Sequence, residues 1–123
     1  MIYADTDFFI ALLKPSGWLK EGARRVAAKY KGQMTTSEAT FIELMLLAKK
    51  YDLDPVGITA SVMALCAIED TSLLKAARYV KDHEIGVFDA FHAAHCGGKI
   101  ISSEPAYERL GIERIRLEAT TDV

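Results

Sequence analysis

Three acidic residues stand alone in apolar stretches of this sequence, each at or near the start of a predicted helix. Asp5 ends the apolar run at the beginning of the chain, Glu43 lies in Phe-Ile-Glu-Leu, and Asp89 lies in Val-Phe-Asp-Ala. A helix N-terminus favours one negative charge by only about 0.3 to 1 kcal/mol, which does not offset gathering three anions in a low-dielectric cleft. A divalent cation would offset it, and carboxylate oxygens are the ligands of Mg²⁺ or Mn²⁺. Spacing alone leaves a second interpretation open, in which each acid is buried and satisfied separately.

The elements that must position these acids alternate between strands and helices. Such alternation is typical of an α/β fold with a parallel sheet covered by helices on both faces. In such folds sites lie just beyond the carboxyl ends of the strands, which is where Asp5 stands. The predicted strands are 2–4, 33–36, a short edge strand at 66–68, a buried strand at 99–103 and a half-exposed edge strand at 113–117. The predicted helices include a nearly all-apolar one at 37–51 that carries Glu43, one at 55–65 begun by Asp54-Pro55, and one opened by Asp89.

Length and composition predict one compact domain spanning residues 1–123. Half of the residues are hydrophobic and the formal net charge is -2, which argues against a protein that binds nucleic acid by bulk positive charge. The most basic stretch is the predicted helix 18–31, whose charged face is either a solvated surface or a surface that steers phosphates. The sequence shows neither a leader pattern nor an apolar run long enough to cross a bilayer, so we expect a cytoplasmic protein.

Histidine and cysteine supply no convincing zinc site. His92, His95 and Cys96 are neighbours, but structural zinc normally has four ligands and catalytic zinc three, and no further pair supplies the rest. Cys66 and Cys96 do not have the spacing of a metal-binding pair. We therefore expect both cysteines to be reduced.

Four acid-bearing segments, taken in order, resemble the PIN-domain family. They are the first strand ending in Asp5, Phe-Ile-Glu-Leu with Glu43, Val-Phe-Asp-Ala-Phe-His-Ala-Ala with Asp89, and Ile-Ser-Ser-Glu with Glu104 before the final strand. The resemblance spans nearly the whole chain. It implies a three-layer α/β/α sandwich whose central parallel sheet has the strand order 3-2-1-4-5.

The resemblance also implies a metal-dependent ribonuclease. Asp5, Glu43 and Asp89 match the family's three principal acids, whereas Glu104 stands where the family more often has aspartate. Asp5 and Asp89 are then expected to hold Mg²⁺ or Mn²⁺, with Glu43 as a ligand or water-orienting group and Glu104 completing a second site. Thr6, Ser102 and Ser103 are expected hydrogen-bonding neighbours. Hydrolysis of this kind leaves 5′-phosphate and 3′-hydroxyl ends and does not need the 2′-hydroxyl.

A small stand-alone domain of this type is similar to the toxins of VapBC-type toxin–antitoxin pairs. That resemblance implies an RNA substrate, a cognate antitoxin and a homodimer, for which the apolar helices 37–51 and 55–65 could supply the surface. Two alternatives stay open. Asp5-Thr6-Asp7 after a first strand is similar to the nucleophile and acid pair of haloacid-dehalogenase phosphatases, which would use Asp5 as the nucleophile. A non-catalytic PIN-like module that binds RNA or protein is the other.

Overall fold

The computed structural model describes residues 1–118, which form seven helices and four short strands. The first half contains β1 (Ile2–Tyr3), α1 (Thr6–Leu13), α2 (Lys20–Lys29), β2 (Met34–Thr35) and α3 (Glu38–Ala48). The second half contains α4 (Pro55–Leu65), α5 (Thr71–His83), α6 (Val87–His95), β3 (Lys99–Ser102), α7 (Ala106–Arg109) and β4 (Glu113–Arg116). Helices and parallel strands therefore alternate over parts of the chain, which is an α/β arrangement.

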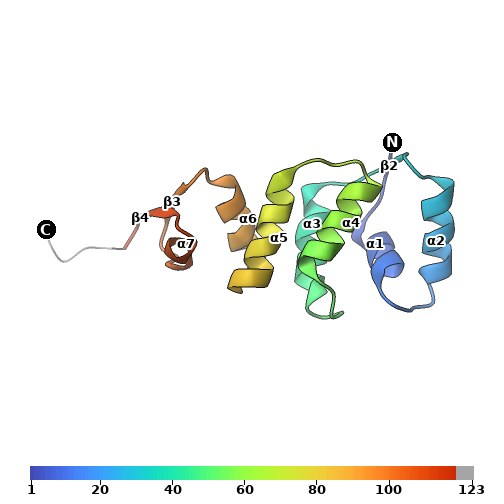
Figure 1. Cartoon of the computed structure of the whole chain (residues 1–123), viewed down its shortest axis with the longest axis horizontal. Coiled ribbons are helices and arrows are strands. Elements are labelled where there is room, and N and C mark those ends of the chain that lie inside the picture. The colour runs from blue at the N-terminus through green and yellow to red at the C-terminus, as the bar shows by residue number, and fades with distance from the viewer. Residues whose placement is uncertain (119–123) are drawn as a thin grey trace, which may run out of the picture.

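The strands form two separate parallel pairs. β1 pairs with β2, matching Ile2 with Met34, and β3 pairs with β4, matching Lys99 with Glu113. Figure 1 shows the two pairs at opposite ends of an elongated molecule, with α3 to α6 between them. Among residues 1–118 the predicted central sheet with the order 3-2-1-4-5, and with it the three-layer arrangement, is thus not confirmed.

The predicted edge strand at 66–68 is wrong, because this segment closes α4 instead. Ala67 adopts a left-handed conformation with φ 52°, the Ile68 amide donates to the Met63 carbonyl at 2.9 Å, and the Ala67 amide donates to Ala64 at 3.4 Å. These two bonds make a Schellman motif, which satisfies carbonyls that the helix end leaves unpaired. A short apolar run can serve a strand or a helix end, and here the local hydrogen bonds decided for the helix end.

The hydrophobic core is centred on α3. This helix contacts α1, α4, α5 and α6, so its apolar residues find partners on nearly every side. Phe41 and Leu44 are almost fully buried there, together with Phe9 from α1 and Val62 from α4. Burial of each such side chain stabilises the fold by about 1.5 to 3 kcal/mol. Packing within one chain therefore accounts for most of the apolar sequence of this helix, whereas Leu46 is 51% exposed.

The second strand pair is exposed, contrary to the prediction of a buried strand at 99–103. Ile101 of β3 is 67% exposed, and Ile115 of β4 is also exposed. Arg114 fastens the pair, since its Nη1 donates to the Ser102 carbonyl at 2.8 Å and to Glu118 Oε1 at 2.9 Å. β4 is largely exposed at an edge, as the alternating sequence predicts.

No helix in residues 1–118 has the length and apolar character to cross a membrane.

Candidate active site

Asp5 lies where the first strand pair ends. Because β1 and β2 are parallel, the residues that follow them emerge at the same edge. The Ala4 amide donates to the Thr35 carbonyl at 2.9 Å, and Thr36 Oγ1 donates back to the Ala4 carbonyl at 2.8 Å. These bonds hold Asp5 next to the start of α3, which places this acid at the carboxyl edge of the strands, as predicted.

The Asp5 carboxylate is the N-cap of α1. Its Oδ1 accepts the Asp7 amide at 2.9 Å, and Asp5 has the extended backbone that a cap requires. The side chain is exposed, and one capping bond leaves most of its acceptor positions open. Asp5 is thus held in orientation by its own helix while its second oxygen remains available for a cation.

Hydroxyl groups surround this end of the strands. Tyr3 Oη and Ser37 Oγ share a hydrogen bond of 2.7 Å, and Thr36 Oγ1 and Thr40 Oγ1 share another of 2.7 Å. Hydrogen bonding by Ser37, followed by that of Thr40 and Thr36, lowers the pKa of Tyr3, while the charge of Asp5 acts in the opposite direction. The Asp5 end is therefore a polar, solvated cluster of one carboxylate and several hydroxyls.

Asp89 lies in the first turn of α6, which begins at Val87 and not at Asp89 itself. The side chain is half-buried, and its Oδ1 accepts the Tyr107 hydroxyl at 3.2 Å. Tyr107 is 3% exposed, and its pKa is raised to about 12 by burial first, then by the charge and hydrogen bond of Asp89, and then by the charge of Glu104. Tyr107 is therefore neutral at physiological pH and donates to Asp89 from α7.

Glu104 lies near Asp89 and also orders the loop after β3. Its amide donates to Ser102 Oγ at 2.9 Å, and its Oε1 accepts the Ala106 amide at 3.0 Å. Ser102 therefore bonds the backbone of Glu104 and not its carboxylate. The charges of Asp89 and Glu104 both raise the pKa of Tyr107.

Glu43 reaches solvent from the middle of α3. It is exposed, and among residues 1–118 it forms neither a side-chain hydrogen bond nor an ion pair. Exposure removes the desolvation cost that a carboxylate in an apolar run suggests. The structure therefore explains Glu43 without a cation, although the carboxylate remains accessible to one.

The four acids do not converge on one point in this structure. Within residues 1–118, no three His, Cys, Asp or Glu side chains lie close enough together to hold a metal ion, and this includes His92, His95 and Cys96. His95 Nε2 lies 4.0 Å from Glu38 Oε1, so the end of α6 faces the start of α3. Asp89 is six residues before His95, about 9 Å away along the helix. An all-oxygen set of donors suits Mg²⁺ or Mn²⁺, but its present geometry does not fit the ion.

Several polar residues at this site are absent from the sequence predictions. Tyr107 is the main one, and its only signal is that it follows Glu104 by three residues in a short helix. Ser37 and Thr40 are the others, and each follows β2 in the way that Thr6 and Asp7 follow β1. Hydroxyl residues are frequent at strand ends in any sequence. Only the contacts in the structure, such as that of Ser37 with Tyr3 and that of Tyr107 with Asp89, identify these residues as part of the site.

Fold and site together define a small α/β protein with carboxylates at strand ends and helix starts. The family model described as PIN domain matches residues 2–111. The chain therefore belongs to the PIN domain family, as the four acid-bearing segments predicted. Comparison with curated proteins and with solved structures gives no significant match. PIN domains are generally nuclease domains and typically use divalent metal ions, so membership supports a hydrolase.

Proposed function

We propose that this protein is a metal-dependent endoribonuclease that hydrolyses RNA phosphodiester bonds. The observation that carries the proposal is the PIN domain match over residues 2–111, a range that contains Asp5, Glu43, Asp89 and Glu104. Each acid lies within reach of solvent, and Asp5 and Asp89 each have a hydrogen bond that fixes the orientation of the carboxylate. Oriented, hydrated carboxylates suit a site that holds Mg²⁺ or Mn²⁺.

The proposal requires the two acid groups to meet, and the strand edges offer a way. β1 pairs only with β2, and β3 only with β4, in the described part of the chain. Ile2 and Tyr3 on one pair and Ile101 on the other are exposed apolar side chains beside these open edges. Open edges and exposed apolar faces favour further pairing. Joining β1 to β3 would produce a sheet with the order β2-β1-β3-β4. This is the predicted order 3-2-1-4-5 without the predicted strand 66–68, and it would bring Glu104 to the edge that holds Asp5.

The side chains have separate tasks in the joined site. Asp5 and Asp89 would hold the principal ion, Glu104 would complete a second position, and Glu43 would bind or orient water. A bound divalent ion supplies a water of lowered pKa and stabilises charge on the phosphate. Tyr107 would keep Asp89 in one orientation, and the α1 amide at Asp7 would do the same for Asp5. Glu104 has one more methylene than aspartate, so its carboxylate reaches further from the loop.

The product ends and the metal requirement test this proposal. We expect cleavage of RNA with Mg²⁺ or Mn²⁺, 5′-phosphate and 3′-hydroxyl products, and loss of cleavage with EDTA. A single 2′-deoxy substitution at the cut site should leave cleavage intact, because water and not the 2′-hydroxyl attacks phosphorus. Cleavage that persists in EDTA, or that a 2′-deoxy substitution abolishes, would contradict the proposal.

We further propose that the protein is the toxin of a VapBC-type pair and acts in the cytoplasm as a homodimer blocked by an antitoxin. The support is the family membership and the exposed apolar side chain Leu117, which the joining of β1 to β3 does not use. A neighbouring reading frame for a small DNA-binding antitoxin would strengthen this assignment, and inhibition of cleavage by its product would test it. A monomer in solution scattering at micromolar concentration would contradict the dimer.

A second candidate is a non-catalytic PIN-like module that binds RNA or protein. The separation of Asp5 from Asp89 and Glu104, with no cluster of three metal-binding side chains in residues 1–118, favours it. Metal titration distinguishes the two candidates. A nuclease gives RNA cleavage that rises with Mg²⁺ or Mn²⁺ and saturates, whereas a binding module gives RNA or protein binding without cleavage at any concentration of either ion.

A further inference from the structure

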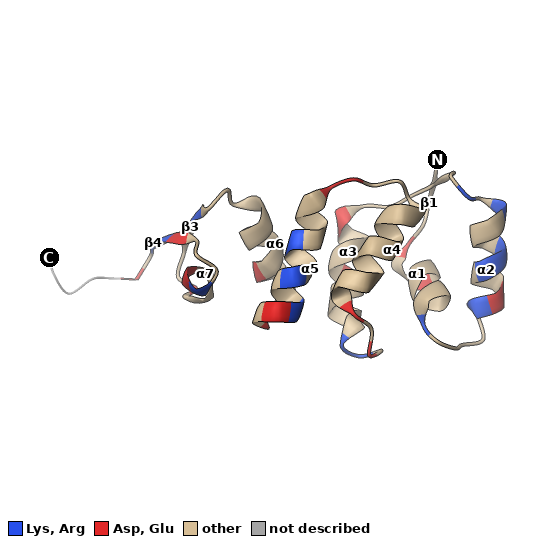
Figure 2. Cartoon of the chain, in the orientation of Figure 1, with Lys and Arg blue, Asp and Glu red and all other residues tan. Residues whose placement is uncertain are grey.

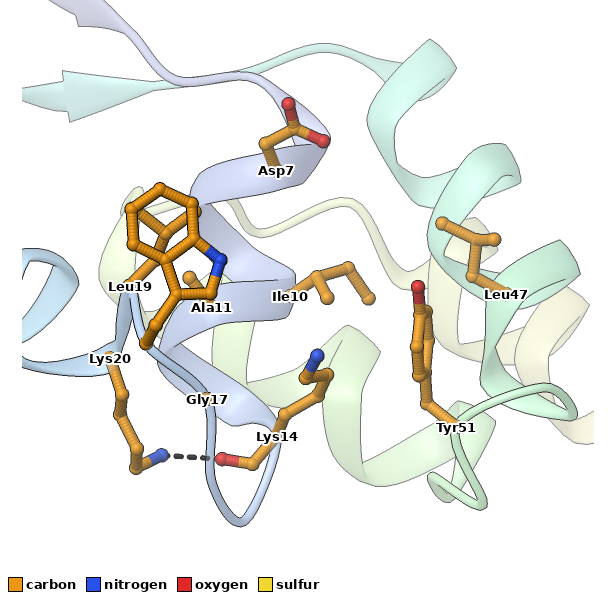
Figure 3. A pocket seen from close by; sticks show the side chains of 10 residues that line it. Asp7, Ile10, Ala11, Lys14, Gly17, Leu19, Lys20, Leu47 and Tyr51 are labelled. Atoms are coloured by element: carbon orange, nitrogen blue, oxygen red, sulfur yellow. Dashed lines mark hydrogen bonds between the residues drawn. The ribbon is translucent and has the colours of Figure 1, made fainter.

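A pocket of about 250 Å³ opens beside α1, away from Asp89 and Glu104. Its wall runs from Asp7 along α1 to Lys14, crosses the connection to α2 at Trp18, and returns at Tyr51 after α3. Figure 3 shows Lys14 and Tyr51 facing each other at one end and Asp7 at the other. Pockets for drug-sized ligands begin near roughly 300 Å³, so this volume suits one flat ring system.

Trp18 is the unusual residue of this pocket. Its side chain is 90% exposed, although tryptophan gains more than most residues by burial. No helix in residues 1–118 includes Trp18, since α1 ends at Leu13 and α2 begins at Lys20. Lys20 stabilises the connection, because its Nζ donates to the Leu12 carbonyl at 2.8 Å and also to the Lys14 carbonyl. An exposed indole on a loop that hydrogen bonds hold in place is a surface on which a planar ring can stack.

Two ammonium groups gather at the opposite wall. Lys14 Nζ lies 4.8 Å from the centre of the Tyr51 ring, and Lys50 Nζ lies 5.4 Å from it. Cation–π attraction to Tyr51 holds the Lys14 ammonium at the pocket, which Lys14 lines, whereas Lys50 contacts the same ring from outside the lining residues. Neither lysine forms an ion pair within residues 1–118. Figure 2 shows further basic residues along α2, interspersed with acidic ones.

We propose that this pocket binds an unpaired nucleobase of a single-stranded RNA, stacked on Trp18, with the adjoining phosphate at Lys14. Aromatic stacking combined with backbone cations is how proteins hold single strands without reading their sequence. The inference rests on the proposed function and names a substrate contact for it. A protein segment is the other conceivable occupant, but the Lys14 ammonium favours a phosphate-bearing ligand.

The place of the pocket along α1 connects it to the proposed active site. Asp7 lines the pocket, and its amide donates a hydrogen bond to the Asp5 carboxylate. Lys14 lies about 10 Å further along α1. A short stretch of single strand can therefore span from Asp5 to Trp18. Among the described residues that line the pocket, Asp7 is the only acid, so anion repulsion is confined to the end where the proposed cation would bind.

Trp18 provides its own assay, because it is the only tryptophan of the sequence. Oligouridine and oligoadenosine are titrated into the wild-type protein with EDTA present, so that cleavage does not interfere. We expect saturable quenching of tryptophan fluorescence, and no comparable quenching by an abasic oligonucleotide of the same length. Quenching by the abasic strand to the same extent, or no quenching by any RNA that binds, would overturn base stacking on Trp18.

Variants test the same interactions by anisotropy of a labelled RNA. Trp18→Ala should weaken binding by about tenfold, while Trp18→Phe should recover most of the affinity. Lys14→Ala should weaken binding and reduce the salt dependence of log affinity by about 0.7 for each phosphate that the protein no longer neutralises. Lys75→Ala is the matched control, since Lys75 Nζ lies 6.0 Å from the Tyr79 ring on α5, outside the pocket. Trp18 is so exposed that its replacement should leave the fold unchanged.

The outcomes separate this inference from the proposed function. If Trp18→Ala binds RNA with wild-type affinity, the inference is overturned, which is also the result expected if a protein segment occupies the pocket. RNA cleavage with Mg²⁺ would in that case still support the nuclease. Complete absence of RNA binding also overturns it. Quenching and loss of affinity in Trp18→Ala, without cleavage in either ion, would support the base pocket and leave the non-catalytic candidate as the function.

Discussion

The two regions that carry candidate acids orient a carboxylate in different ways. Asp5 and Asp89 are each near the start of a helix, and each has a tyrosine nearby. Tyr3 is 56% exposed and its pKa is lowered by neighbouring hydroxyls, while Tyr107 is 3% exposed and its pKa is raised to about 12. Asp5 is oriented by an amide two residues away, and Asp89 by a phenol eighteen residues away.

This difference teaches which acid depends on the tertiary structure. The N-cap of Asp5 forms whenever α1 forms, so its orientation survives changes elsewhere. The bond between Asp89 and Tyr107 forms only when α7 packs against α6, with Tyr107 in a small cluster beside Ala93 and Ile112. We therefore expect changes at the Asp5 end to act on chemistry alone, and changes at the Asp89 end to act on both chemistry and stability.

The largest effects are expected from the acids themselves. Asp5→Asn and Asp89→Asn should each reduce RNA cleavage by more than about a hundredfold, since even groups that only orient metal ligands are worth roughly 10- to 100-fold. Asparagine caps helices as well as aspartate does, so Asp5→Asn should unfold at the same denaturant concentration as the wild type. Cleavage rates measured at saturating Mg²⁺ provide the test.

Asp7→Asn is the matched control for Asp5→Asn. Asp7 is exposed in the first turn of α1 and accepts no side-chain hydrogen bond within residues 1–118, so its loss should change cleavage by no more than a few-fold. Equal losses in the two variants would contradict the assignment of Asp5 as the principal acid of this strand. Full activity in Asp89→Asn would contradict the nuclease site as a whole.

Removal of the Tyr107 hydroxyl should have the next largest effect. Tyr107→Phe keeps the ring in its buried position and deletes the bond to Asp89, so we expect about tenfold slower cleavage. The free energy of unfolding should fall by about 0.5 to 1.5 kcal/mol, as for a typical hydrogen bond. Urea unfolding followed by circular dichroism measures the second effect. Unchanged cleavage with reduced stability would show that Tyr107 supports the fold without positioning Asp89.

Alkaline pH should affect stability through the same phenol. The folded-state pKa of Tyr107 is about 12, above its ordinary value of 10.0, so its contribution to stability is complete below pH 10. Between about pH 10 and 12 the unfolded chain loses this proton and the folded chain keeps it, so the unfolding free energy falls as pH rises. The wild type should therefore lose more stability than Tyr107→Phe over this range in urea titrations. Parallel curves would show that the pKa of Tyr107 is not raised.

The smallest effect is expected at the other tyrosine. Tyr3→Phe deletes the exposed bond to Ser37, and exposed substitutions usually change stability by less than about 0.5 kcal/mol. Comparison of the urea midpoints of Tyr3→Phe and Tyr107→Phe tests the contrast between the two ends directly. A loss at Tyr3 as large as that at Tyr107 would mean that the hydroxyl cluster at Asp5 is as important to the fold as the buried phenol.

Local sequence signals were sufficient wherever the deciding contacts are close along the chain. Asp54 followed by Pro55 predicts the start of α4, and its carboxylate does accept the Val56 amide at 3.1 Å. The family could be recognised for a related reason, because each acid-bearing segment is a short local pattern and their order is visible in the sequence.

The sequence by itself determined the start of α4 at Asp54-Pro55 and the family of the chain, because these depend on hydrogen bonds and patterns within a few residues. Only the tertiary structure decided that Glu43 faces solvent and that Asp89 is held by Tyr107. It also decided that Asp5 lies apart from Asp89 and Glu104. Such long-range contacts depend on which faces pack together, and many packings bury the same apolar residues almost equally well.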